Sequence, residues 1–335
     1  MKHLIVILLS FFLFNACSNE LELTAPWKNI PIVYGVLNEA DQVQYIRVEK
    51  AFLDDNTSAL ELAKNADSLY YTDVLVQLER PSLNTTLTLE RVDGVQEGLI
   101  REVGVFASEP NILYKVDLEG VAPLAGGEKV NLLVVDAKDQ VLASSETTVV
   151  ESFDLIRGRP GEELNFSNYE RTIRLSWRPT ESAAIYDAQF IINYRENAEG
   201  SSTEFVDKSV VWTVASNFLK ESSDNSAQIT IEIGGQDFYT FLDGAIESSN
   251  KIRRFVDMDF VVTAGGSELA EYIRIRQANT GLTSSQDTPI FSNIEGGLGL
   301  FSSTAVARKE GITLTPASLD SLFSGFYTRD LNFVE

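Results

Sequence analysis

Histidine and cysteine are almost missing from this chain, since each occurs once in 335 residues, as His3 and Cys17. Serine–histidine and cysteine–histidine catalysis both need an imidazole beside the nucleophile, so neither is open to the chain beyond residue 17. A zinc site with imidazole or thiolate ligands is excluded there for the same reason. Disulfide bonds are excluded as well, so stability must come from packed cores, for which a chain of 37.1 kDa has enough residues.

Positive charge is also scarce. Lysine and arginine number 27 against 49 aspartates and glutamates, which gives a formal net charge of −22. The acidic excess is spread over both halves of the sequence and does not form a tail. Such a field repels the phosphates of nucleic acids and strongly disfavours nucleic-acid binding, whereas attraction of cationic partners or divalent ions stays open.

The single cysteine stands where an apolar run stops and acidic residues begin. Lys2 and His3 precede the apolar run Leu4–Phe14, which is too short to span a bilayer as a helix. We therefore predict a signal peptide over residues 1–16 and a tether over residues 17–26. A buried cysteine in a signal-anchor helix is the alternative interpretation.

The residues Leu13-Phe14-Asn15-Ala16-Cys17 resemble a bacterial lipobox. The resemblance implies that the Cys17 thiol is alkylated by diacylglycerol and that Cys17, with fatty acids such as palmitate, becomes the membrane anchor. The acidic stretch Ser18–Glu22 resembles the signal by which Bacteroidota move lipoproteins to the outer leaflet, and a solvated linker is the alternative. We expect a lipid-anchored protein of the outer membrane, on its periplasmic or its cell-surface face.

Alternation of apolar and polar residues dominates the rest of the chain and predicts half-buried β-strands. The segments are Ile112–Leu118, Val130–Val134, a returning strand that ends at Val149, Ile173–Trp177, Tyr186–Tyr194, Ile229–Ile233, Val256–Val262 and Ile273–Ile275. Because short turns separate them, we expect a mainly-β fold of two antiparallel β-sandwich domains of the immunoglobulin or fibronectin III kind.

Two segments show helical periodicity. Apolar stripes run through Phe238–Ile246 and Leu319–Phe326, and Thr315-Pro316 supplies an N-cap with proline at the first helical position. We predict helices near 236–247 and 316–326 that cover the second sheet, and a further helix over Ser58–Asp67. The glycine- and proline-rich stretch 151–166 separates a sandwich at 27–150 from a β-rich domain at 151–335.

Two segments resemble known families. Leu175–Pro179 is similar to the early strands of a fibronectin III-like sandwich. The closing segment Thr288–Ser303, which contains Asn-Ile-Glu-Gly-Gly-Leu-Gly-Leu-Phe, resembles the end motif of a Bacteroidota outer-membrane lipoprotein family of unknown function, often encoded near TonB-dependent receptors. That resemblance implies an immunoglobulin-like first domain, a lipidated Cys17 and an outer-membrane partner, and it supplies no catalytic residue.

Three further groups were weighed as sites. Gly296, Gly297 and Gly299 suggest either a ligand loop or, preferably, a tight turn packed against the core. Asp54-Asp55-Asn56 and Asp224-Asn225 lack the spacing of a calcium loop, and solvated turns are preferred. Asp257 and Asp259 share a strand face as paired carboxylates or, preferably, as residues of its wet side. We expect no metal, no cofactor and no catalytic residue.

Three functions are ranked from these observations. The first is a lipid-anchored binding or accessory subunit of an envelope transporter or surface assembly. The second is a structural component of secretion or gliding machinery. The third is a hydrolase that uses only carboxylates, such as a glycosidase. An aromatic-lined cleft would favour the first, an extensive flat apolar interface the second, and two facing carboxylates the third.

Overall fold

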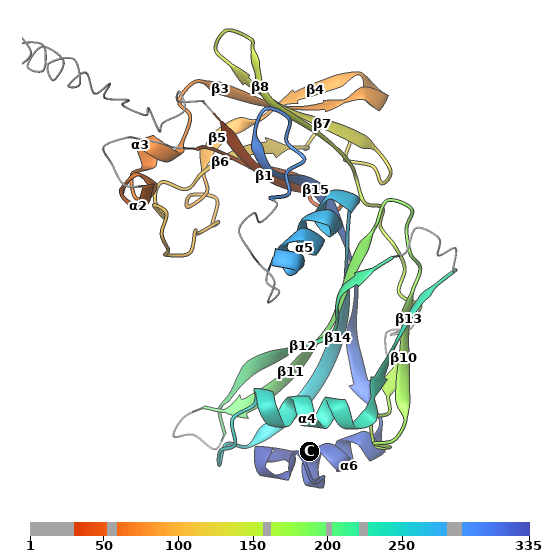
Figure 1. Cartoon of the computed structure of the whole chain (residues 1–335). Helices are drawn as coiled ribbons and strands as arrows, with labels where there is room; N and C mark the ends of the chain where they lie inside the picture. Colours follow the sequence, from red (N-terminus) through yellow and green to blue (C-terminus); the bar gives the residue numbers. More distant parts are fainter. Residues whose placement is uncertain (1–29, 52–58, 157–161, 199–202, 221–226, 280–289) are drawn as a thin grey trace, which may run out of the picture.

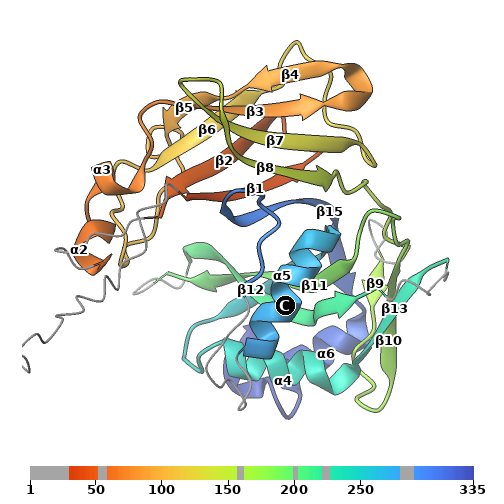
Figure 2. The same cartoon turned by 45° about the horizontal axis from the view of Figure 1, so that its top comes forward.

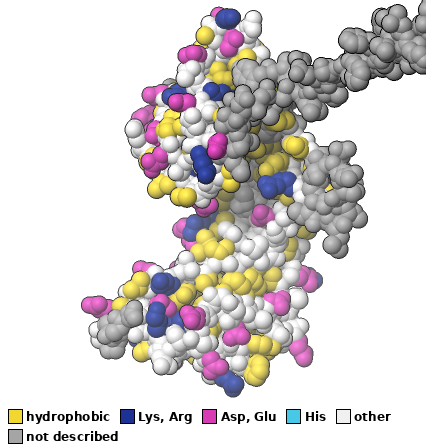
Figure 3. Space-filling view, turned by 60° about the vertical axis from the view of Figure 1, so that its left-hand side comes forward, with side chains coloured by type: hydrophobic (Ala, Val, Ile, Leu, Met, Phe, Trp, Pro, Cys, Tyr) yellow, Lys and Arg dark blue, Asp and Glu magenta, His cyan; other side chains and the backbone are white. Residues whose placement is uncertain are grey.

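The computed structural model of the chain describes residues 30–51, 59–156, 162–198, 203–220, 227–279 and 290–335. Two large hydrophobic cores give the molecule two lobes (Figure 1, Figure 2), and the space-filling view shows a hollow between the lobes (Figure 3). The fold is mainly β, with several antiparallel sheets, as the alternating sequence pattern predicts.

The first lobe is a sandwich of two sheets. One sheet contains β1 (Pro31–Asn38), β2 (Val43–Lys50), β5 (Glu90–Asp93) and β6 (Ile112–Asp117), and the other contains β3 (Val74–Arg80), β4 (Thr85–Thr88), β7 (Lys129–Asp136) and β8 (Val141–Thr148). Alternate side chains enter the core, among them Val33, Ile46 and Leu132, each 0% exposed. The short helices α2 (Ala59–Ala63) and α3 (Ala66–Leu69) and the 3-10 turn η2 (Pro81–Leu83) complete this lobe.

One ion pair is buried inside the first sandwich. Arg80 donates hydrogen bonds from Nε and Nη2 to Glu128 at 2.8 and 2.7 Å, and the two side chains are 1% and 4% exposed. Burial acts to raise the pKa of Glu128, but hydrogen bonds from Arg80 and from the backbone N–H of Ala125 outweigh it and lower that pKa. The pair holds the loop before β7 against the end of β3.

The second lobe is built on four long strands. They are β11 (Ile185–Asn197), β12 (Phe205–Leu219), β14 (Arg253–Gly265) and β15 (Leu298–Leu314), joined by the short strands β9 (Glu163–Leu164) and β16 (Phe333–Val334). The pair β10 (Thr172–Trp177) and β13 (Ile229–Gly234) forms a second layer that shares the same core. Alternate residues of β11 from Tyr186 to Tyr194 are buried there, which confirms the predicted core face.

Strand β15 belongs to both lobes. Its first part pairs in parallel with β1, and its second part pairs antiparallel with β14. One continuous sheet therefore runs β12-β11-β14-β15-β1-β2-β6-β5 through the molecule, and Figure 1 shows β15 crossing from the upper lobe to the lower. The two lobes are joined by backbone hydrogen bonding as well as by the linker.

Both predicted helices of the second lobe are present, as α4 (Gly235–Ala245) and α6 (Pro316–Ser324). The Asp237 carboxylate accepts the backbone N–H of Gly234 at 3.0 Å, and the Thr315 hydroxyl accepts that of Ser318 at 3.4 Å, so both helices begin with a side-chain cap. Their apolar residues Phe238 and Leu322 are 0% exposed and close the core of the second lobe. The 3-10 turn η3 (Arg329–Leu331) follows α6.

A third helix, α5 (Ser267–Asn279), was missed, and the predicted strand Ile273–Ile275 is wrong. Two isoleucines separated by one residue fit a strand, but the surrounding Glu, Leu, Ala, Arg and Gln residues favour a helix. The helix has no continuous apolar stripe because only residues near its start, such as Ala270, are buried. It lies against β15, between the two lobes, as Figure 1 and Figure 2 show.

The division of the chain at residue 150 describes only part of the arrangement. Val149 packs in the first core and Val150 in the second, but Ile294 and Phe301 return to the first core. The first sandwich therefore includes residues that the sequence-based division gave to the second domain. The pairing of β15 with β1, between residues far apart in the sequence, and the bridge between Ser144 and Glu295 produce this arrangement.

Candidate binding groove

An apolar groove lies on the hollow side of the molecule, where α5 faces the strands β1 and β15. It encloses about 270 Å³. Its lining residues are Ile32, Tyr34, Tyr272, Ile275, Arg276, Ile290, Phe291, Leu298 and Gly299. Figure 3 looks onto this side and shows hydrophobic side chains gathered in and beside the hollow. We call this surface the Tyr34 groove.

Strand alternation brings Tyr34 and Leu298 to the outer face of the sheet. Val33 and Phe301 point into the first core with 0% exposure, so their neighbours face the opposite side. Tyr34 is 44% exposed and Leu298 is 40% exposed, and Ile32 is paired with Leu298.

The opposite wall combines aromatic rings with one cation. Tyr272 and Arg276 are one helical turn apart on α5, and Arg276 Nη1 donates to the Tyr272 hydroxyl at 2.9 Å. The guanidinium carbon lies 5.5 Å from the centre of the Tyr272 ring. Phe291 meets the same ring edge-on, with the two ring centroids 6.4 Å apart. The groove thus offers aromatic surface with a guanidinium at its margin.

The electrostatics of Tyr34 reflect its position in the groove. Burial raises the pKa of its hydroxyl, Tyr272 and Glu49 raise it further, and Arg276 acts in the opposite direction. Glu49 itself accepts hydrogen bonds from Arg101 at 2.8 Å and from Arg47 at 3.3 Å. Tyr34 therefore stays protonated at neutral pH and is available as a hydrogen-bond donor to a bound group.

The glycines of the closing motif form the floor beside this groove. Gly299 has φ +125°, and a Cβ there would overlap the carbonyl oxygen of Val33. At Gly297 a Cβ would lie 2.6 Å from the carbonyl oxygen of Pro31. Gly296 and Gly297 thus lie in the packed turn that the sequence favoured, whereas Gly299 lies in β15, where its backbone packs against β1 and borders the groove.

Asn293 fastens this turn to the sandwich. Its Oδ1 accepts the backbone N–H of Phe301 at 2.9 Å, and its Nδ2 donates to the Phe301 carbonyl oxygen at 2.6 Å. Nδ2 also donates to the Ser145 hydroxyl at 3.0 Å, and that hydroxyl donates to the Asn293 carbonyl oxygen at 2.7 Å. The motif is therefore a structural clamp between β8 and β15.

The other residues weighed from the sequence are placed as follows. Asp257 accepts a hydrogen bond from Asn193 at 2.8 Å, and Asp259 pairs with Arg308 at 2.5 Å. Asp259 is only 5% exposed, so its predicted position on the wet side of the sheet is wrong. The strand prediction also placed Val256 on the core face, but it is 41% exposed. Cys17 and the segments 54–56 and 224–225 lie outside the described residues.

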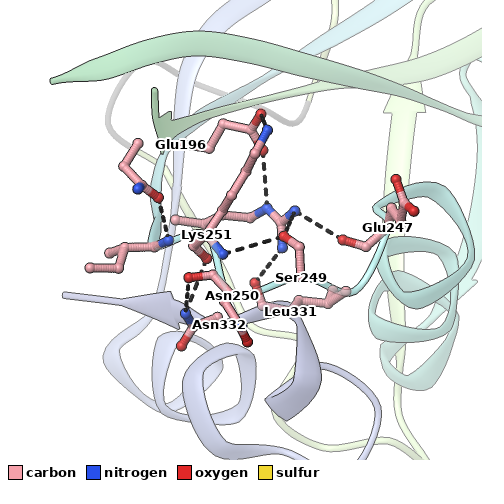
Figure 4. A network of polar contacts seen from close by, with 10 residues as sticks. Glu196, Glu247, Ser249, Asn250, Lys251, Leu331 and Asn332 are labelled. Carbon is pink, nitrogen blue, oxygen red and sulfur yellow. Dashed lines mark hydrogen bonds and ion pairs between the residues drawn. The ribbon is translucent and has the colours of Figure 1, made fainter. Parts of the chain in front are cut away.

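A second cluster of buried charge serves the fold. Arg253, 3% exposed, donates to the carbonyl oxygens of Leu331 and Glu247 at 2.6 and 2.9 Å, and Glu196 accepts from Lys251 at 2.8 Å (Figure 4). Burial acts to raise the pKa of Glu196, but Lys251 and Arg253 outweigh it and lower that pKa. These contacts tie β14 to the C-terminal segment.

Among the described residues, no group of three histidine, cysteine, aspartate or glutamate side chains is arranged to hold a metal ion. No helix in the described part of the chain is long and apolar enough to cross a membrane.

Among the groove residues, the sequence drew attention to Gly299, as part of a ligand loop or a packed turn, but it indicated no site at Tyr34 or on the α5 side of the groove. One signal was present, because the segment Ile32-Val33-Tyr34-Gly35-Val36-Leu37 is apolar on both faces, which is typical of a strand covered on both sides. No comparable signal marked Tyr272, which lies beside the segment taken for a strand.

Comparison with known proteins gives only distant likenesses. No family model and no curated protein matches the chain. Among solved structures, the calcium binding domain CBD12 of CALX1.1 is 8% identical, with a TM-score of 0.18 over 82% of this chain and 98% of that one. CBD12 from CALX1.2 is 9% identical, with a TM-score of 0.20 over 83% and 99%. The chicken CNTN1 FN1–FN3 domains are 6% identical, with a TM-score of 0.17 over 83% and 64%. Scores this low carry no argument about function.

Proposed function

We propose that this chain is an outer-membrane lipoprotein, anchored through Cys17, that acts as a binding or accessory subunit of an envelope transporter or surface assembly. The observation that carries the proposal is the Tyr34 groove, an aromatic-lined cleft of the kind that distinguishes a binding subunit from the alternatives. The lipobox-like residues before Cys17 support the anchoring. The proposal assigns no catalytic step to the chain.

The composition of the groove indicates the chemistry of its partner. Tyr34, Tyr272 and Phe291 offer ring faces and edges, which suit an apolar or aromatic group, and aromatic residues with arginine are enriched where proteins bind one another. Arg276 at the margin suits a carboxylate or another hydrogen-bond acceptor. We therefore expect an outer-membrane protein that inserts an aromatic or aliphatic side chain next to an acidic group.

Anchoring is tested by the variant Cys17→Ser. We expect it to lose incorporation of labelled palmitate and to leave the membrane fraction, because the thiol is the only site for a thioether-linked lipid. Retention of label and of membrane association by Cys17→Ser would refute the anchoring.

Partner binding is tested by purifying the lipidated protein from its native envelope in a gentle detergent. We expect an outer-membrane protein to co-purify in constant ratio and to be lost with Tyr34→Ala or Tyr272→Ala. Phe326→Ala is the matched control, because it removes an aromatic ring that is 72% exposed and is not among the groove residues. Equal recovery of the partner from all three variants would contradict the role of the groove.

A further inference from the structure

The strand β12 forms one edge of the continuous sheet, and no described strand pairs with its outer side. In an antiparallel ladder, every second residue of an edge strand directs its N–H and C=O away from its only neighbour. From Phe205 to Thr213 the register with β11 is unbroken, so these outward groups form a regular row. Beyond Thr213 the register shifts, which ends the regular row.

This edge lacks much of the protection that natural edge strands carry. Residues 209–219 contain no charged side chain and no proline, and Asp207 and Lys208 are the only charges earlier in the strand. Val206 and Val211 are 46% and 51% exposed although they are β-branched residues within a sheet. Native proteins interrupt such edges with charge, proline or bulges. Here Asp207 and Lys208 are the only charges in the strand, no proline occurs, and the register shifts lie beyond Thr213.

We propose that the outer edge of β12 binds an extended segment of a partner protein, which adds a strand to the sheet opposite Phe205–Thr213. The occupant follows from the surface, because a regular row of outward backbone donors and acceptors matches the hydrogen-bonding groups of another extended backbone. The partner strand is uncharged and β-branched opposite Val210 and Val211, and it is acidic opposite Lys208. The inference concerns a surface separate from the Tyr34 groove and stands without the proposed function.

A second copy of the chain is a poorer occupant. If the β12 edges of two copies paired antiparallel over the whole regular row, the pairing would be centred on Ser209. The two Lys208 side chains would then lie diagonally opposite each other on one face of the sheet. Self-pairing centred further along, on Val211, sets Asp207 and Lys208 against the irregular part of the other strand. A separate straight strand meets neither obstacle.

The test uses the purified protein and a defined probe. The probe is a fluorescent peptide of alternating threonine and valine with one glutamate placed to oppose Lys208, and its control is the same peptide methylated on alternate backbone nitrogens. We expect the unmethylated peptide to bind at least about tenfold more tightly, because methylation removes the ladder hydrogen bonds. Equal binding of the two peptides, or no binding of either, would overturn the proposal.

A proline variant places the peptide on the edge. Hydrogen exchange of the free protein shows whether the Val210 or the Val211 N–H points outward, since the outward amide exchanges faster. Proline at that residue removes only an unpaired donor, so we expect the melting temperature to fall by less than about 3 °C. The affinity for the peptide should fall at least about tenfold, because one ladder hydrogen bond is lost and the added strand is disturbed. Threonine at the same residue keeps the N–H and should keep binding. Unchanged binding by the proline variant, or a protein dimer that this variant abolishes, would overturn the proposal.

Discussion

The substitution Phe301→Ala tests whether the closing motif belongs to the first sandwich. Phe301 is 0% exposed and packs in the first core, although the sequence-based division placed it in the second domain. Removing a buried phenylalanine ring costs about 3–5 kcal/mol, and the paired backbones of β1 and β15 limit how far the cavity can collapse. We therefore expect a loss of about 4 kcal/mol from the free energy of unfolding of this lobe.

Hydrogen exchange measured by mass spectrometry locates that loss. A destabilisation of about 4 kcal/mol corresponds to about a thousandfold faster exchange of the amides in β7 near Leu132, which exchange only when the lobe opens. Phe326→Ala, which removes an exposed ring, should change stability by less than about 0.5 kcal/mol. If Phe301→Ala accelerated exchange only in the second lobe and left β7 unchanged, the assignment of the motif to the first core would be refuted.

Three further substitutions, and one control at Gly244, test the packing and the buried polar groups. Gly299→Ala should destabilise the protein by more than about 3 kcal/mol in urea unfolding, because the new Cβ overlaps backbone atoms of Val33 at a positive φ. As a control, Gly244→Ala in the open part of α4 should stabilise the protein by up to about 1 kcal/mol. Equal effects of the two substitutions would contradict the close approach of β15 to β1. Arg80→Met should cost about 3–5 kcal/mol at pH 7 by leaving Glu128 buried without its cation. The folded-state pKa of Glu128 is lowered from 4.5, so the stability that its charge contributes should disappear as pH falls below about 4.5. A free energy of urea unfolding that does not change with pH in that range would argue against the pair. Burial raises the pKa of the Tyr239 hydroxyl from 10.0 to about 12, so the stability that the protonated hydroxyl contributes should be lost as pH rises from 10 to 12. Tyr239→Phe should flatten that part of the plot of stability against pH, and an unchanged plot would contradict the raised pKa.

The regular elements were largely predictable because their signals are local. Alternation along residues 186–194 indicated a strand buried on one face, and Thr315 with Pro316 marked the start of α6. Helix α5 was missed because its partial burial leaves no apolar stripe for periodicity to detect.

The candidate groove could not be predicted because no single segment contains it. Tyr34 and Leu298 lie in strands that pair in parallel across most of the chain length, and Tyr272 comes from the helix that was mistaken for a strand. The same long-range pairing explains the return of β15 to the first lobe, which the boundary at residue 150 overlooked. Glycine spacing at residues 296–299 indicated a packed turn but gave no information on its partner strand.

The central claim is that the Tyr34 groove holds a partner in the outer membrane. It is tested most directly by placing a photo-reactive phenylalanine analogue at residue 34 in the lipidated protein and irradiating intact cells. Residue 326 serves as the control position, because its ring is 72% exposed and lies outside the groove. We predict one dominant adduct with an outer-membrane protein from residue 34, weakened by Tyr272→Ala and absent from residue 326. No adduct from residue 34, or the same adducts from both positions, would contradict the account.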